Sequence, residues 1–160
     1  MNTKPTYEEL QKKVKLLEYQ LNELKKSQQD IDKEKYYFEQ AQKIAKLSTW
    51  EYNVENEKIF WTPENYKTFG IPIGKKITNE LILELVHPDD REPLIKTWQD
   101  TIKGKPYDVE HRLVVHGKIK WIRNKAKLIY NDKGDVVRLI GITQDITYRK
   151  NTEKKLKEAK

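Results

Sequence analysis

The sequence predicts an α+β fold, in which a five-stranded antiparallel sheet carries short helices on one face and follows a long N-terminal helix. Two observations predict this fold. Apolar residues recur every three or four positions from Tyr7 to Ile31, which is the period of an amphipathic helix. Between residues 48 and 147 the pattern gives two strands, three helical segments and then three strands. This order packs as one antiparallel sheet with its helices on one side.

The N-terminal segment has the apolar seam of a coiled coil. No Gly or Pro interrupts residues 6–47, and seven apolar residues fall at the a and d positions of a heptad repeat. A seam this narrow cannot be buried by one helix alone, so we expect residues 1–37 to pair with a second copy as a homodimer. The relative direction of the two helices stays open, and the alternative is a helix that folds back on its own domain. The seam residues are Tyr7, Leu10, Val14, Leu17, Leu21, Leu24 and Ile31.

Residues 38–147 are expected to form one domain, with 148–160 as the start of an outgoing helix. Alternation of apolar and polar residues predicts strands at 49–54, 58–61, 107–115, 118–130 and 136–146. Thr62, Thr78 and His87 are candidate caps at the starts of three helices, and Pro63 and Pro88 suit the first helical position.

Composition excludes several classes of function. The chain has no cysteine, which rules out disulfides, thiolate metal sites, thiol nucleophiles and flavin–cysteine photoadducts. The net charge of +7 is concentrated in residues 148–160, which carry +4, whereas residues 48–147 carry only +1, so we expect no nucleic-acid partner. No run of 18 apolar residues exists and the N-terminus is no signal peptide, so we expect a cytoplasmic chain without a membrane span.

Four segments, in this order and spacing, resemble a Per-Arnt-Sim (PAS) sensor domain of the type found in bacterial and archaeal sensor histidine kinases. They are residues 45–52, His87-Pro-Asp-Asp-Arg91, Glu110-His-Arg112 with Gly117-Lys-Ile-Lys-Trp121, and Asp145-Ile-Thr147 with Arg149-Lys150. The resemblance covers roughly residues 38–150.

The resemblance implies a cytoplasmic sensory or dimerisation module of a signal-transduction protein, usually a histidine kinase of a two-component system. A diguanylate cyclase, a transcription regulator and a ligand-free oligomerisation scaffold are the alternatives. The chain contains no output domain, so it is read as the N-terminal piece of a longer protein, and a response regulator would be reached only through that missing domain. We expect no enzymatic activity of this piece, because no phosphate loop, metal cluster or nucleophile–base arrangement occurs.

The strand-to-helix joint is the candidate site of signal transmission. Asp and Thr are side chains that accept hydrogen bonds from free N–H groups at a helix start. The resemblance implies that this joint couples the sheet to the outgoing helix. Its residues are Asp145, Ile146, Thr147 and Arg149.

A candidate ligand pocket lies between the predicted sheet and helices, although a solid core explains the same residues. The eight residues proposed to line it are Trp61, Tyr66, Phe69, Trp98, His111, Leu113, Ala126 and Leu139. The ligand stays unidentified. Haem is not expected, because it needs an axial histidine and only His87, His111 and His116 are present, and we expect no metal site.

Two charged pairs have ordinary structural interpretations. Asp89 and Asp90 are expected to complement the free N–H groups of a first helical turn. Glu110 and Arg112 are expected to form surface or dimer-edge ion pairs.

Overall fold

The computed structural model describes residues 3–160, and the chain divides into two compact units, residues 1–41 and 42–160. Helix α1 spans Tyr7–Ala45, which matches the predicted uninterrupted helix. Its N-terminus has a capping box, in which the Thr6 backbone N–H donates to the Glu9 carboxylate and the Glu9 N–H donates to the Thr6 hydroxyl. The seven seam residues are 45–77% exposed in the single chain.

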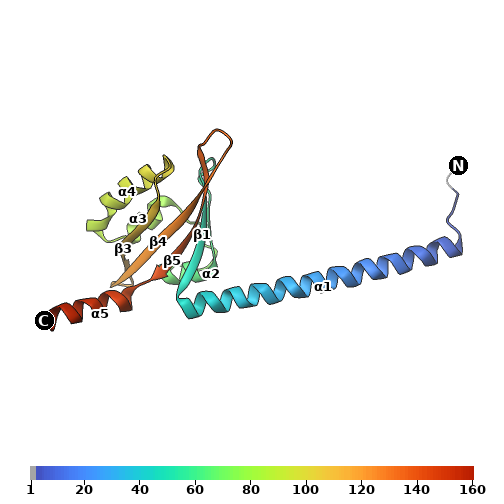
Figure 1. Ribbon diagram of the computed structural model, residues 1–160, viewed down its shortest axis with the longest axis horizontal. Helices are drawn as coiled ribbons and strands as arrows, with labels where there is room; N and C mark the ends of the chain where they lie inside the picture. Colours follow the sequence, from blue (N-terminus) through green and yellow to red (C-terminus); the bar gives the residue numbers. More distant parts are fainter. Residues whose placement is uncertain (1–2) are drawn as a thin grey trace. The chain divides into compact units, whose positions relative to one another are not determined.

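The second unit has a five-stranded antiparallel sheet in the order β2-β1-β5-β4-β3 (Figure 1). The predicted α+β fold is therefore confirmed. The strands are β1 (Leu47–Asn53), β2 (Ile59–Trp61), β3 (Tyr107–Val115), β4 (Lys118–Tyr130) and β5 (Val136–Asp145).

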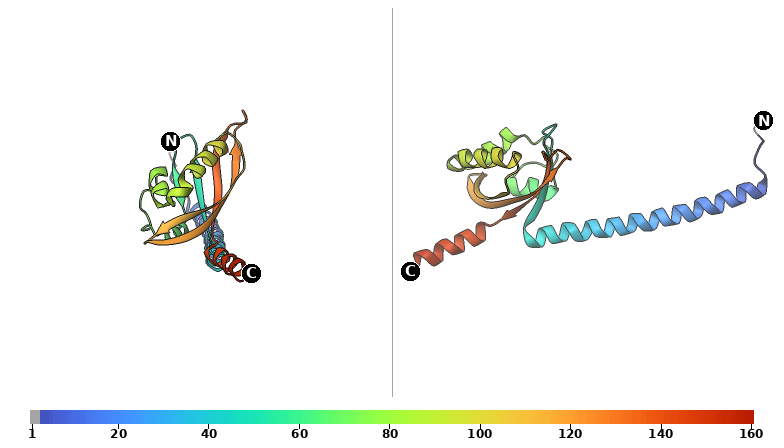
Figure 2. Two further views of the ribbon diagram at one scale, coloured as in Figure 1. Left: turned by 90° about the vertical axis from the view of Figure 1, so that its left-hand side faces the viewer. Right: turned by 45° about the horizontal axis from the view of Figure 1, so that its top comes forward.

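Three helices lie on one face of this sheet, and a fourth leaves its end (Figures 1 and 2). They are α2 (Pro63–Phe69), α3 (Asn79–Leu85), α4 (Pro88–Ile102) and the outgoing α5 (Thr147–Glu158). None of the helices within residues 3–160 has the length and apolar character that a membrane span requires.

Two of the three predicted helix caps act as expected. The Thr78 hydroxyl accepts the Leu81 N–H at 3.2 Å, and His87 Nδ1 accepts the Asp89 N–H at 3.3 Å. The side-chain cap predicted for Thr62 is wrong, since its hydroxyl bonds the backbone of Thr49 on β1 instead. Thr62 therefore holds α2 against the sheet.

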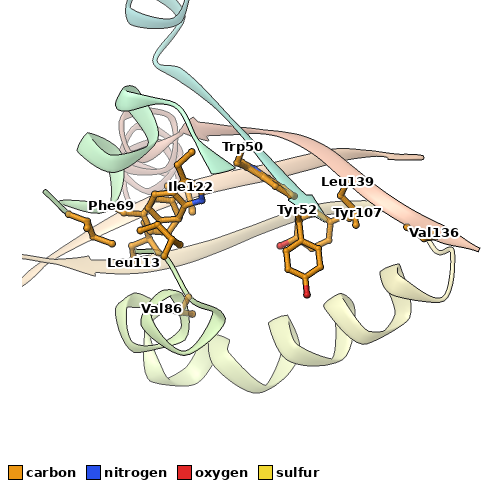
Figure 3. Close-up of a cluster of buried hydrophobic side chains, with 12 residues drawn as sticks. Trp50, Tyr52, Phe69, Val86, Tyr107, Leu113, Ile122, Val136 and Leu139 are labelled. Atoms are coloured by element: carbon orange, nitrogen blue, oxygen red, sulfur yellow. The ribbon is translucent and has the colours of Figure 1, made fainter. Parts of the chain in front are cut away.

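The core fills the space between the sheet and its helices, as Figure 3 shows for side chains such as Trp50, Val86 and Leu139. Leu113, Ile122 and Leu139 are completely buried. Gly141 on β5 pairs with Trp50 on β1, and a Cβ at residue 141 would overlap the Trp50 indole. Glycine at this position thus leaves the space that the indole occupies next to β5.

Candidate functional site

A cavity of about 250 Å³ lies between the sheet and the helices of the second unit. Every strand and the helices α2, α3 and α4 contribute to its wall. The lining residues are Trp50, Tyr52, Ile59, Trp61, Asn65, Phe69, Asn79, Ile82, Leu83, Leu94, Ile95, Trp98, Gln99, Tyr107, His111, Asn124 and Thr143.

Four of the eight residues proposed for the pocket line this cavity, and four do not. Trp61, Phe69, Trp98 and His111 lie in its wall. The wall does not include Tyr66, Leu113, Ala126 or Leu139, which pack into or against the core instead. Core and cavity lie on the same face of the sheet. Alternation along a strand therefore predicts which residues face inward, but not which of these border the cavity.

Aromatic rings form much of the wall, and no Asp, Glu, Lys or Arg takes part in it. Trp98 packs edge-on against Tyr52 at 5.0 Å and against Tyr107 at 5.4 Å between ring centroids. Burial raises the pKa of Tyr107 far above its usual value, so this phenol is neutral at any physiological pH. The wall is therefore uncharged and presents flat apolar surfaces.

The polar part of the wall is organised by Asn124 on β4. The Asn124 side-chain oxygen accepts hydrogen bonds from Trp50 Nε1 at 3.2 Å and from the Thr143 hydroxyl at 2.6 Å. These two donors orient the amide, so its nitrogen faces His111 Nε2 at 3.3 Å. Burial lowers the pKa of His111, which favours the neutral ring in this network.

Asn124 was not selected as a candidate from the sequence, although a signal for it exists. It interrupts the inward-facing row of β4 formed by Ile122, Ala126 and Leu128, and it is 7% exposed. A second buried pair, in which the Ser48 hydroxyl donates to the Asn65 side-chain oxygen at 2.6 Å, adds another polar position.

The strand-to-helix joint is held to β4 by backbone and side-chain hydrogen bonds. Asp145 Oδ1 accepts the Thr147 N–H at 3.0 Å, as expected for a residue that caps a helix start. The Thr147 hydroxyl bonds both backbone groups of Trp121 rather than a helix N–H, which corrects the role expected for it. Ile146, which is buried, donates its N–H to the Trp121 carbonyl at 2.9 Å.

Arg149 lies one turn further on, where it pairs with Glu110 on β3. Sheet and helix α5 are thus joined at Trp121 and at Glu110.

Residues 3–160 contain no group of three or more His, Asp or Glu side chains arranged to hold a metal ion. Of the three histidines only His111 borders the cavity, since His87 caps α4 and His116 is an exposed turn residue with φ +50°.

Comparisons with known proteins agree on the fold. Residues 58–143, more than half of the chain, match the family described as the PAS fold. The chain is 28% identical over 141 residues, 88% of its length, to the "Probable diguanylate cyclase DgcE" of Escherichia coli K12. It is 27% identical over 111 residues, 69% of its length, to the blue-light-activated histidine kinase of Brucella ovis.

A sensory box histidine kinase/response regulator from Burkholderia thailandensis has a similar solved structure, with a TM-score of 0.63 and 26% identity. This similarity covers 76% of the present chain and 93% of that one. The matches span only 13% of the length of DgcE and 22% of the Brucella kinase.

Proposed function

The chain belongs to the PAS fold family, and we propose on this basis that it senses a small molecule for a longer cytoplasmic protein with a histidine kinase output. Sequence similarity to the Brucella kinase and structural similarity to the Burkholderia kinase support this output. A diguanylate cyclase is the second candidate output, because the match to DgcE covers more of the chain. A kinase output would bring a response regulator as partner, reached through the output domain alone.

The uncharged cavity is the observation that carries the sensory proposal. Burying an unpaired carboxylate is strongly unfavourable, so a wall without Lys or Arg selects against an anionic ligand. A cavity of about 150 Å³ is large enough to bind benzene. A cavity of about 250 Å³ therefore suits a planar molecule of one or two rings, with the amides of Asn79 and Gln99 as polar contacts.

Quinoline and quinoline-6-carboxylate test this proposal, since they share one ring system and differ by a negative charge. We expect saturable binding of quinoline, monitored by tryptophan fluorescence, and binding of the carboxylate at least about tenfold weaker. Ile82→Trp fills the cavity and should abolish binding. Ile119→Trp adds the same ring at a residue that is 52% exposed and outside the cavity wall, and should change nothing. Equal binding of both probes, or binding that survives Ile82→Trp, would contradict the proposal.

The Brucella relative is named as blue-light-activated, and we propose a flavin, which absorbs blue light, as the alternative to a one- or two-ring occupant. Because this chain has no cysteine, a flavin bound here would have to act without a cysteine adduct. The visible absorption spectrum of the purified protein tests this occupant directly.

We also propose that α1 pairs with a second copy through its seam. Three heptads with exposed apolar a and d positions support this, because such a stripe is stable only when covered. Leu17→Lys places a charge in the seam and should convert a dimer into a monomer in light scattering. Leu16→Lys is the control, since Leu16 is equally exposed but lies outside the seam. A dimer that persists in Leu17→Lys would refute the seam.

Binding and dimerisation together separate sensing from scaffolding. If the chain forms a seam-dependent dimer and no uncharged ring compound binds, the oligomerisation scaffold is the better description.

A further inference from the structure

Residues 110–112 of strand β3 alternate between the cavity and the opposite face of the sheet. His111 lies in the cavity wall, whereas the side chains of its neighbours Glu110 and Arg112 pair with α5 and α4. Because β3 is an edge strand, these two side chains are well placed to reach the helices next to it. One short segment thus borders the cavity and contacts two helices.

Arg112 fastens β3 to the start of α4. Its guanidinium donates two hydrogen bonds to Asp90, at 3.0 and 2.7 Å, and its backbone N–H donates a third at 2.8 Å. The carbonyl of Arg112 accepts the His87 N–H at 2.9 Å. Hydrogen bonds from Arg112 lower the pKa of Asp90, which is therefore ionised. Asp90 was expected to serve the helix dipole alone, and the cross-chain pair with Arg112 could not be seen in the sequence.

Glu110 fastens β3 to the start of α5. Its carboxylate pairs with both Arg149 and Lys150. Hydrogen bonds from Lys150 and Arg149 lower the pKa of Glu110, which favours its ionised carboxylate. The ion pairs expected for Glu110 and Arg112 are present, but they join strand to helix within one chain.

Trp121 on β4 connects these two attachments. Its ring lies 5.5 Å from the Arg112 guanidinium carbon and 4.9 Å from Lys150 Nζ, both within cation–π range. It is also the cross-strand partner of Arg112. Its backbone holds Thr147 at the start of α5. Contacts are therefore continuous from the first turn of α4 to the first turn of α5.

We propose that Asp90, Arg112, Trp121, Lys150 and Glu110 form a link, here called the β3 link, that couples the helix walling the cavity to the outgoing helix. This inference rests on the proposed function in one respect, namely that α5 carries the signal. The β3 link is a second route to α5, in addition to the Asp145–Thr147 joint. A ligand that displaces α4 would move Arg112 through Asp90, and the Trp121 ring would pass the change to Lys150.

Hydrogen exchange of the α5 amides tests the β3 link in the chain without any ligand. Glu110→Gln removes the direct contact and should raise exchange of residues 150–156 by about two- to fivefold, the range expected for partly exposed ion pairs. Asp90→Asn does not touch α5, yet it should raise the same rates by up to about twofold, because the route passes through Trp121.

Asp108→Asn is the matched control. Asp108 lies two residues from Glu110 on β3 and receives two hydrogen bonds from Arg123 at 2.8 and 2.7 Å, and neither bond involves a helix. It should leave α5 exchange unchanged. In a Trp121→Leu background Asp90→Asn should have no further effect on α5, and the folding of each variant is verified by its urea midpoint.

One result overturns the inference. If Asp90→Asn raises exchange at the start of α4 and leaves α5 as in the wild type, the two helices are not coupled through this route. Arg112→Lys provides an independent variant, since it keeps the charge but loses the paired hydrogen bonds, and it should act like Asp90→Asn. Quinoline binding without this coupling would preserve the proposed function and refute the β3 link. Coupling without quinoline binding would support the β3 link and contradict the proposed function.

Discussion

Replacing Asn124 by leucine should destabilise the second unit strongly, although the two side chains have similar volumes. The substitution removes the acceptor of Trp50 Nε1 and of the Thr143 hydroxyl, and both donors are buried. A buried donor left without a partner costs about 1–3 kcal/mol, so two of them predict a loss of about 2–6 kcal/mol. That loss is a large part of the total stability of a domain, roughly 5–15 kcal/mol.

Urea unfolding followed by tryptophan fluorescence measures this loss selectively. All four tryptophans lie in residues 42–160, so the signal reports on this unit and not on residues 1–41. Adding Thr143→Val to Asn124→Leu removes one orphaned donor and should recover about 1 kcal/mol. A loss below about 1 kcal/mol for Asn124→Leu, or no recovery in the double variant, would refute the idea that this network organises the cavity.

Three further predictions concern packing, pH and capping. Gly141→Ala should cost about 1–3 kcal/mol in urea unfolding, because its Cβ would overlap Trp50, and less in a Trp50→Leu background; equal costs in both would contradict the overlap. The pKa of Asp90 is lowered in the folded state, so its contribution to stability is present above the unfolded pKa and is lost as the pH falls through the folded value. The free energy of unfolding should therefore fall less between pH 7 and about pH 3 for Asp90→Asn than for the wild type. Thr78→Ala should cost about 1 kcal/mol and Thr78→Ser much less, and equal losses would exclude the hydroxyl as the cap.

Local patterns were sufficient to predict the secondary structure of this chain. The predicted bounds of β3 and β4 match the structure residue for residue, because turn residues delimit the two strands. The predicted start of the outgoing helix, residue 148, lies one residue from the start of α5 at Thr147, since Asp and Thr mark a helix start.

Contacts between distant segments were not predictable in the same way. The Asp90–Arg112 pair joins residues 22 positions apart, and nothing in the local sequence distinguishes Arg112 from other exposed arginines. The residues that border the cavity were not predictable from the local sequence either, because His111 and Leu113 share a face of β3 and only His111 borders the cavity. A polar residue in an apolar row, such as Asn124, is the signal that would have improved that prediction.

The two outer strands of the sheet, β2 and β3, also have features that protect it from aggregation. Unpaired backbone groups at the outside of a sheet are templates for pairing with other chains. Strand β2 offers only three residues, Ile59–Trp61, and is followed by Pro63, while Val86 and His87 occupy the backbone of β3 at residues 112 and 113. The segment that fastens α4 thus also blocks part of the surface on which a second sheet could grow.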